Sequence, residues 1–324
     1  MGSRAARKQL AGPTSGAVSV PSRRVTRPVF SIVLATRDRA ALLQRALEGL
    51  LELDFPPAQL ELCLVDNASC DDTAERAAAF AARAPFAVQL LAEPKVGLSA
   101  ARNRGVRAAR GEYLFFTDDD QLVDPWVLRE HQRVAHRYRV SAVQGAIELS
   151  FTAMRPAWLR GPLAAVLGET RRVPEGLADV DLYGGNMVLR RDVFDELAGF
   201  REDLGKGAAG YAEDVELTRR LRARGEPIAY APSARIFHLI GPERASAAFL
   251  RRCSFEKGYS DGLIVPPARR AARALGALRG ASTQSALSLL AAPFTHSRIV
   301  AQTRALDHLG RLVGLARAHA RGQG

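Results

Sequence analysis

The sequence predicts an α/β fold built on a doubly wound, mainly parallel β-sheet. Four runs of β-branched, aliphatic or aromatic residues have the length and composition of buried strands: residues 29–36, 60–66, 86–93 and 112–118. A stretch with helical spacing of apolar residues follows each of the first three. Strands that alternate with helices imply right-handed crossovers between parallel strands. With 324 residues, 47% of them hydrophobic, the chain can bury a large core, which excludes disorder throughout.

The predicted elements follow one another in a regular order. The strand VFSIVLAT precedes the helical stretch RAALLQRALEGLLEL, LELCLVD precedes DDTAERAAAFAAR, FAVQLLAE precedes GLSAARNRGVRAAR, and EYLFFTD is the fourth strand. Thr36, Asp66 and Asp118 stand at the ends of three of these strands. Sheets of this kind bind ligands at the carboxyl ends of their strands. We therefore expect three separate stretches of sequence to meet at one edge of the sheet.

The net charge of +12 is concentrated at the two ends of the chain. Residues 1–28 contain six Arg or Lys and no acid, and residues 264–324 contain nine Arg and one acid. These ends carry +6 and +8 of the total of +12, which leaves about −2 for residues 29–263. The central part therefore has no excess positive charge, which disfavours a nucleic-acid-binding protein. Basic ends are typical of solvated tails, or of attraction to an anionic membrane surface or polyanion.

Composition divides the chain into three parts. Residues 1–28 are rich in Gly, Pro, Ser and Arg and lack an apolar stretch of signal-peptide length, so we expect a flexible basic leader. Residues 29–262 form the predicted α/β domain, and residues 263–324 form a basic helical extension. The Arg-flanked apolar residues of this extension are typical of amphipathic helices that pack on the core, on a partner or on a membrane face. Residues 280–297 are too polar for a transmembrane helix.

The cysteines indicate a reducing compartment. Cys63, Cys70 and Cys253 show no metal-ligand spacing, and their odd number argues against a disulfide framework. We therefore expect a cytoplasmic protein. Peripheral contact with the inner face of the membrane, through the basic C-terminal helices, stays open at this point.

Three adjacent carboxylates, Asp118, Asp119 and Asp120, follow the fourth predicted strand. Like charges this close repel one another unless a cation or a hydrogen-bonding partner offsets the repulsion. A structural alternative is an acidic turn that caps the next helix, but a helix cap normally needs a single Asp. The cluster therefore indicates a site that binds a cation or donor groups.

Seven short stretches carry a resemblance to a known family. In order along the chain they are SIVLATRDR, VDNASCDDT, GLSAARNRG, FTDDD, GGNMVLRR, AGYAEDVELTRRLRARG and IFHL. Over roughly residues 29–262 the chain resembles the family 2 glycosyltransferases of the GT-A fold, which depend on nucleotide sugars. The resemblance implies a sheet domain with a nucleotide-binding half and an acceptor-binding half. It also implies inverting transfer of a sugar from a nucleoside-diphosphate sugar to an acceptor hydroxyl.

The resemblance relates FTDDD to the DXD motif of this family. A divalent cation, Mn²⁺ or Mg²⁺, would bridge the phosphates and offset the charge of the leaving group. Asp118 would contact the ribose or the water shell of the metal, Asp119 would orient the loop of the nucleotide-sugar site, and Asp120 would ligate the metal. His238, which follows the strand-like ARIF, would be a further metal ligand, with a lone core or surface histidine as the alternative.

The last residue of the first predicted strand and the three residues after it face the nucleobase in this resemblance. The segment from Thr36 to Arg39 would lie over the base, with its backbone groups at the base edge. The family usually has Pro at position 35 and an aromatic or similar residue at position 37, whereas this chain has Ala35 and Arg37. A guanidinium plane can stack on a base in place of an aromatic ring.

Two further side chains are assigned to the nucleotide. Asp66 would accept a hydrogen bond from the imide N–H of uracil or thymine, although guanine also offers a donor edge. Arg102 would point into the cleft, where it could pair with phosphate or with Asp66. UDP is the leading donor nucleotide, and dTDP and GDP stay open.

The acceptor side rests on a glycine pair and two larger residues. Gly184 and Gly185 permit close approach of the backbone to a ligand, and Asn186 could hydrogen-bond sugar hydroxyls. The resemblance implies a donor-sugar and acceptor floor at this point, and a plain tight turn is the alternative. Trp158 could stack on a sugar face, although simple packing explains it equally well.

The general base is predicted in the stretch that opens the helical pattern of residues 213–225. Glu213 and Asp214 could be mere helix N-terminal acids, but inverting transfer needs a base within hydrogen-bond reach of the acceptor hydroxyl. The resemblance gives this role to Asp214, and Glu213 would bind acceptor hydroxyls or orient the loop. The Gly-rich residues just upstream are typical of a loop that closes over substrate.

Two other functions, nucleotidyl transfer and binding of a nucleotide sugar without catalysis, are alternatives to sugar transfer. A nucleotidyltransferase normally has a Gly-rich phosphate loop with Lys or Arg after the first strand, and LATRDRA lacks it. A catalytically silent nucleotide-sugar-binding scaffold would not need Asp120 and Asp214 together. Saccharide, lipid-linked and natural-product acceptors all fit the sequence.

Overall fold

One mixed sheet forms the centre of the protein. The computed structural model describes residues 27–170, 173–291 and 295–321, so the predicted leader lies almost entirely outside it. Within these residues the strands have the order β3-β2-β1-β4-β8-β6-β9-β5, and β7 pairs with β9. The strands are β1 (Phe30–Thr36), β2 (Leu60–Asp66), β3 (Ala87–Ala92), β4 (Tyr113–Asp118), β5 (Gln121–Val123), β6 (Ala142–Phe151), β7 (Gly176–Leu177), β8 (Met187–Arg190) and β9 (Ile228–Ile240).

The sheet is mainly parallel, as the sequence predicts. β1 pairs in parallel with β2 and β4, and β2 pairs in parallel with β3. β8 runs antiparallel to both β4 and β6, and β6 runs parallel to β9. The strands β1, β2, β3, β4, β6 and β9 therefore share one direction. The antiparallel strands β5, β7 and β8 all pair with strands of the second half of the sheet or at its border.

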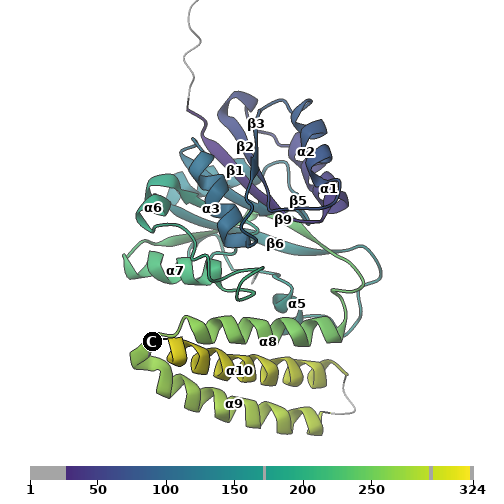
Figure 1. The fold of residues 1–324 in the computed structure, drawn as a ribbon, viewed down its shortest axis with the longest axis vertical. Helices are drawn as coiled ribbons and strands as arrows, with labels where there is room; N and C mark the ends of the chain where they lie inside the picture. Colours follow the sequence, from purple (N-terminus) through teal and green to yellow (C-terminus); the bar gives the residue numbers. More distant parts are fainter. Residues whose placement is uncertain (1–26, 171–172, 292–294, 322–324) are drawn as a thin grey trace, which may run out of the picture.

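Helices cover both faces of the sheet (Figure 1). Buried residues of α1 (Ala40–Leu51), α2 (Thr73–Ala81) and α4 (Val127–Tyr138) pack in one core cluster, and those of α3 (Leu98–Ala108), α6 (Arg191–Glu196) and α7 (Glu213–Ala223) pack in another. The sheet is therefore doubly wound. The short helix α5 (Pro162–Val166) and the 3-10 turns η1 (Pro57–Gln59) and η2 (Pro267–Arg269) lie in connections.

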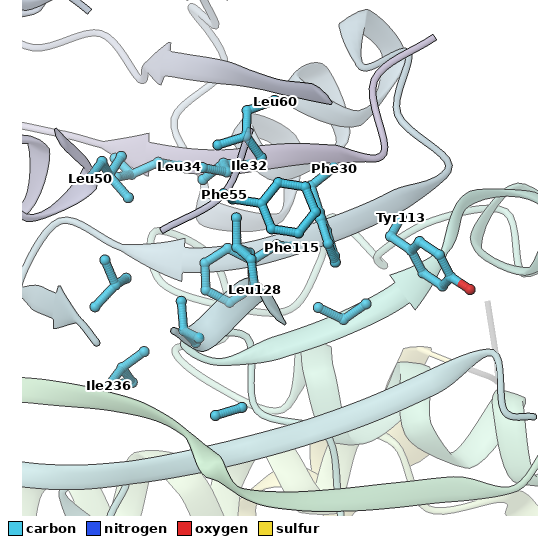
Figure 2. Close-up of a cluster of buried hydrophobic side chains, with 14 of the residues drawn as sticks. Phe30, Ile32, Leu34, Leu50, Phe55, Leu60, Tyr113, Phe115, Leu128 and Ile236 are labelled. Atoms are coloured by element: carbon cyan, nitrogen blue, oxygen red, sulfur yellow. The ribbon is translucent and has the colours of Figure 1, made fainter. Parts of the chain in front are cut away.

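The central strands β1 and β4 are almost entirely buried because both faces of the sheet are covered there. Alternate residues of a strand point to opposite faces. In β1, Phe30, Ile32 and Leu34 belong to one core cluster, and Val33 belongs to the other. Figure 2 shows the first cluster, where Phe30 lies beside Phe55 with 5.3 Å between the ring centroids. This two-sided core fixes the register of the central strands.

The register brings the predicted strand ends together. Thr36 of β1 lies opposite Asp66 of β2, and Ala35 lies opposite Asp118 of β4. The expected meeting of three sequence segments at one edge of the sheet is confirmed. β9 is longer than the sequence suggested and continues to Ile240, so His238 lies within this strand and not after it.

Three C-terminal helices form a layer below the sheet domain (Figure 1): α8 (Ala247–Leu263), α9 (Arg270–Leu290) and α10 (Thr295–Arg321). α10 lies between the other two. Gly258 and Gly262 of α8 face Gly310 and Gly314 of α10, and a side chain at any of them would collide with the backbone of the facing helix. The two helices therefore touch backbone to backbone. No helix among the described residues has the length and apolar content needed to cross a bilayer.

Candidate active site

A cleft of about 660 Å³ opens at the carboxyl ends of β1 and β4. Its walls also include the first turns of α3 and α7, the loop before α7, and residues of α8 and α10. Eleven of the fourteen site residues predicted from the sequence line it: Thr36, Arg37, Arg39, Arg102, Asp118, Asp119, Asp120, Gly185, Glu213, Asp214 and His238. The fold thus brings the first predicted strand end, the acid cluster and the predicted base into one cavity.

Arg102 links the acid cluster to the predicted base region. Its guanidinium is 2% exposed and donates to Asp118 (Nη2–Oδ1, 2.7 Å) and to Glu213 (Nη1–Oε1, 2.9 Å). A Cβ on residue 184 would collide with this guanidinium, so Gly184 is required by close approach. The alternative pairing of Arg102 with Asp66 is wrong, because both of its terminal nitrogens point to the other carboxylates.

Asp119 ties the first strand to the acid cluster. Its carboxylate accepts from the Thr36 hydroxyl (2.8 Å) and from Nη1 of Arg39 (2.7 Å). Burial raises the pKa of Asp119 to about 6, against the opposing charge of Arg39. These contacts agree with the predicted loop-orienting role of Asp119.

Asp120 is the most heavily compensated carboxylate of the cleft. It lies near Nη1 of Arg39 (3.1 Å), Nη1 of Arg244 (2.5 Å) and Nε2 of His238 (3.5 Å). Burial by itself would raise the pKa of Asp120. The hydrogen bond and charge of His238, followed by the charges of Arg244 and Arg39, outweigh burial and hold that pKa well below its usual range. Asp120 therefore stays ionised across the physiological pH range.

The orientation of His238 suits a metal ligand. Its Nδ1 lies 2.9 Å from the carbonyl oxygen of Leu167, and a carbonyl can only accept, so Nδ1 carries the proton. This bond fixes the ring and directs Nε2 toward Asp120, the arrangement that metal-binding histidines use. Two ligands that bind one cation at about 2.0–2.2 Å lie about 3–3.5 Å apart. The separation of 3.5 Å between Nε2 of His238 and Oδ1 of Asp120 fits that distance.

This pair does not make a complete metal cage. Among the residues that the structure describes, no group of three or more His, Cys, Asp or Glu side chains could hold a metal ion. Mg²⁺ commonly takes one or two carboxylate ligands from the protein and completes its coordination with water and substrate phosphate. The residues present therefore fit a cation that binds together with a phosphate-bearing ligand.

Asp214 and Glu213 start α7 in a different electrostatic environment. Oδ2 of Asp214 accepts from the backbone N–H of Gly184 (3.0 Å), and Oδ1 accepts from that of Val215 (2.8 Å). Burial raises the pKa of Asp214, while the Gly184 N–H and the charge of Arg102 oppose the shift. Burial, then the charge of Asp214, raises the pKa of Glu213 to about 7. Both carboxylates therefore hold protons more readily than free acids do.

Three predicted site residues do not line the cleft. Asp66 lies at the predicted strand end, where its Oδ1 accepts from the N–H of Ser69 (3.0 Å), and its role toward a base stays a prediction. The proposed sugar contact of Asn186 is wrong. Its fully buried amide donates to the carbonyls of Ala146 and Ala234 and accepts from His131. These bonds join the residue before β8 to β6 and β9.

Trp158 belongs to the packing of the lower layer. It lies against a cluster that contains Leu159, Leu163 and Ile299, and its carbonyl oxygen is 2.7 Å from Nδ1 of His296. The packing explanation for Trp158 is therefore the correct one, and a stacking contact with an acceptor in this cleft is not supported.

The structure adds two cations that the sequence did not reveal. Arg244 follows β9 and reaches Asp120, and Phe249 lies near its guanidinium, 5.6 Å from ring centroid to Cζ. Lys257 of α8 lines the cleft and donates to the carbonyl of Val166 (2.8 Å). The positions of both side chains depend on how α8 packs beneath the sheet. No short stretch of the sequence predicts that packing.

The loop before α7 contributes a further cation. Gly205, Gly207 and Gly210 have φ values of +88°, +85° and +100°, which other residues rarely adopt. Between them, Lys206 lines the cleft with its Nζ 4.0 Å from the centre of the Tyr211 ring. Closure of this loop over substrate stays a prediction.

Comparison with known proteins identifies the family. Residues 31–198 match the sequence profile of the family described as "Glycosyl transferase family 2". The chain belongs to glycosyl transferase family 2. A relative from Rhizobium meliloti, "Succinoglycan biosynthesis protein ExoM", is 26% identical over 284 residues, which cover 84% of this chain and 88% of the relative. This family 2 chain is therefore a glycosyltransferase, and not the nucleotidyltransferase that the sequence left open.

Solved structures agree on the fold. A mannosyltransferase, PcManGT from Pyrobaculum calidifontis, solved with GDP-Man and Mn²⁺, has a TM-score of 0.63 at 21% identity and covers 88% of this chain and 87% of its own. TarS of S. aureus has a TM-score of 0.50 at 16% identity and covers 91% and 92%. The family 2 chain therefore has the predicted GT-A fold with additional C-terminal helices.

Proposed function

We propose that this glycosyltransferase moves a sugar from a nucleoside-diphosphate sugar to an acceptor hydroxyl by one direct displacement, with inversion at the anomeric carbon. One observation carries the proposal. A single cleft holds an ionised carboxylate beside an oriented histidine, Asp120 and His238, and also a carboxylate of raised pKa, Asp214. The first pair suits a cation, and the second group suits a proton acceptor.

Asp120 and His238 would hold the divalent cation, Mn²⁺ or Mg²⁺, between Oδ1 and Nε2. When bound, the cation offsets the negative charge that gathers on the diphosphate leaving group. The presence of Mn²⁺ with GDP-Man in the similar mannosyltransferase supports this assignment. Asp118, held by Arg102, would contact the ribose or the water shell of the cation.

Asp214 would act as the general base. Its Oδ2, oriented by the Gly184 N–H, would take the proton of the acceptor hydroxyl as the hydroxyl oxygen bonds to the anomeric carbon. The bond from that carbon to the phosphate oxygen breaks at the same time, and the nucleoside diphosphate leaves with the electron pair. A raised pKa favours proton transfer to Asp214 near neutral pH. Glu213, fixed by Arg102, would orient the loop or the acceptor.

Arg244 would bind the diphosphate. In the structure its guanidinium lies on Oδ2 of Asp120, where it competes with a metal ion for one carboxylate. With Asp120 engaged as a ligand, the Arg244 guanidinium would be released from this carboxylate and could donate bidentate hydrogen bonds to a diphosphate. Arg39, which also contacts Asp120 and has a side chain that is 42% exposed, would stay over the nucleotide with Arg37 and Thr36.

UDP remains the first nucleotide to test, because Asp66 at the β2 end suits the imide N–H of uracil. GDP follows, because the similar mannosyltransferase binds GDP-Man. The acceptor is a saccharide, a lipid-linked sugar or a natural product. Three free cysteines support a reducing, cytoplasmic location for the reaction.

A thermal-shift series tests the proposal directly. Purified protein is heated with UDP, GDP or dTDP, each with and without Mn²⁺, and the series is repeated with Asp120→Ala. We expect one nucleotide to raise Tm only when Mn²⁺ is present, and the variant to lose that shift. No shift with any nucleotide would contradict the proposal, whereas a shift without release of nucleoside diphosphate from the matching nucleotide sugar would favour a silent scaffold. Release of pyrophosphate, and not nucleoside diphosphate, from the matching nucleotide sugar would contradict sugar transfer.

A further inference from the structure

We propose that the outer side of the C-terminal helical layer binds an anionic membrane surface. We call this side the outer helical face. It comprises the exposed apolar residues of α9 and α10 together with the exposed arginines of the same helices. The apolar members are Leu275, Leu278, Leu287, Leu289, Leu290, Leu309 and Val313, and the exposed arginines include Arg273, Arg279, Arg304 and Arg317.

The apolar residues of this face are not covered by any other part of the chain that the structure describes. Among the described residues, thirteen large hydrophobic side chains are exposed, and seven of them lie on α9 and α10. In α9 only Ala277 and Ala281 are buried, and α9 lies outermost in the layer (Figure 1). Leu289 and Leu290 are 79% and 78% exposed. A cluster of exposed leucines of this kind marks an interaction surface.

The charge of the region selects an anionic occupant. Residues 264–324 contain nine Arg and one acid, Asp307. The Asp307 carboxylate pairs with Arg311 (2.9 Å), so it does not neutralise the exposed arginines. A second copy of the chain on this face would bring like charges together. Residues 1–26 carry five basic residues and no acid, so they offer no complement either.

A membrane surface satisfies both properties at once. Leucines of an amphipathic helix enter the boundary between headgroups and acyl chains, and arginines pair with anionic headgroups. A helix that lies in the interface needs no bilayer-spanning length. The outer helical face therefore fits surface attachment through α9.

The layer also connects this face to the active site. Lys257 and Asp261 of α8 and Asp307 of α10 line the cleft on the inner side of the same layer. Attachment through α9 would hold the cleft close to the lipid surface. Among the proposed acceptors this favours a lipid-linked one, a step that rests on the proposed function, whereas membrane binding itself does not.

Vesicle co-sedimentation of the full chain tests the proposal without any activity measurement. The probes are vesicles of phosphatidylcholine alone and vesicles of phosphatidylcholine mixed with phosphatidylglycerol. We expect the protein to bind the mixed vesicles, to bind the neutral ones far less, and to lose binding as salt is added, because salt screens exposed charges.

Two double variants separate the apolar and charged contributions. Leu289→Ser with Leu290→Ser should weaken binding at least about tenfold, whereas Leu90→Ser, at a leucine of β3 that is 46% exposed, should not change it. Arg273→Gln with Arg279→Gln should weaken binding about thirty-fold, and Arg45→Gln, on the exposed side of α1, serves as its control. Unchanged thermal unfolding shows that each variant folds.

Three results would overturn the proposal. The first is absence of binding to the mixed vesicles at low salt. The second is equal weakening by the control variants, which would show a contact that is not specific to this face. The third is a dimer in light scattering that the Leu289→Ser, Leu290→Ser variant abolishes, which would make a second copy the occupant.

Discussion

Two clusters of adjacent acids line the same cleft, and their surroundings give them opposite properties. Asp120, in the cluster after β4, lies within 3.5 Å of Arg39, Arg244 and His238, and its pKa is held well below the usual range. Asp214, at the start of α7, accepts from two backbone N–H groups, and burial raises its pKa. The side chains are chemically identical.

The difference shows that the partners, and not the residue type, determine what each carboxylate can do. An acid surrounded by guanidinium and imidazole groups stays charged, which suits a ligand for a cation. A buried carboxylate whose hydrogen-bond donors are neutral backbone N–H groups takes up a proton more readily, which suits a general base. Arg102 forms ion pairs with Asp118 of one cluster and with Glu213 of the other. A change of charge in one cluster therefore alters the electrostatic environment of the other.

The largest effect should come from Asp214→Asn, which removes the proton acceptor without changing its shape. We expect sugar transfer to fall about 10²–10⁴-fold, the usual contribution of general base catalysis. Nucleotide binding with Mn²⁺, measured by calorimetry, should stay unchanged because the binding cluster is intact. Full turnover in this variant would show that Asp214 is not the base. The difference in pKa between the two clusters would then have no role in catalysis.

Asp120→Asn tests the role of the other acid cluster, the predicted binding of a cation. A neutral amide cannot balance the charges of Arg39 and Arg244, or hold a divalent cation as a carboxylate does. Transfer should fall about 10²–10³-fold, and Mn²⁺ should no longer tighten nucleotide binding. Asp119→Asn is the matched control, because Asp119 contacts Thr36 and Arg39 and not His238. If Asp119→Asn alone abolished the Mn²⁺ effect, the metal would be held elsewhere.

Sequence patterns predicted the elements whose surroundings are repetitive. β2 was predicted from Leu60 to Asp66 and has those bounds, and β1 begins one residue later than predicted. Buried parallel strands are nearly continuous apolar runs, and the apolar runs of β1 and β2 end at polar residues, Thr36 and Asp66. The acid clusters were found for the same reason, because each follows or opens a regular element.

The errors came from residues whose partners are distant in sequence. Asn186 has the right composition for sugar binding, but His131 and two carbonyls of other strands occupy its amide. Arg244 gave no signal because its partner, Asp120, lies 124 residues earlier. The close contact of α8 and α10 has a visible trace in the sequence, two glycines four residues apart in each helix, at 258 and 262 and at 310 and 314.

Arg244→Gln should change two affinities in opposite directions, that for Mn²⁺ and that for the nucleoside diphosphate. Without nucleotide, Mn²⁺ should bind more tightly, since Arg244 no longer competes for Asp120. With Mn²⁺, the nucleoside diphosphate should bind about ten- to a hundred-fold more weakly, the loss expected for a charged hydrogen bond of about 1.5–3 kcal/mol. Calorimetric titration measures both affinities. A purely structural role would lower both together, and that result would contradict the diphosphate assignment.

The smallest effect should be a shift in the pH dependence caused by Lys257→Met. Burial raises the pKa of Asp214, and the charge of Lys257 is among those that oppose this rise. Removal of the cation should therefore raise the pKa of Asp214 further. Asp214 accepts a proton only as the carboxylate, so the acidic limb of the kcat/KM profile should move to higher pH.

Lys206→Met separates this charge effect from a general loss of cations in the cleft. Lys206 also lines the cleft, but its contacts are with Glu256 and the Tyr211 ring. The acidic limb should keep its position in that variant, whatever happens to the height of the profile. If both variants moved the limb equally, the pKa of Asp214 would depend on the total charge of the cleft. If Lys257→Met left the limb in place, the base would be a carboxylate other than Asp214, and the two clusters would need to be compared again with Glu213 in that role.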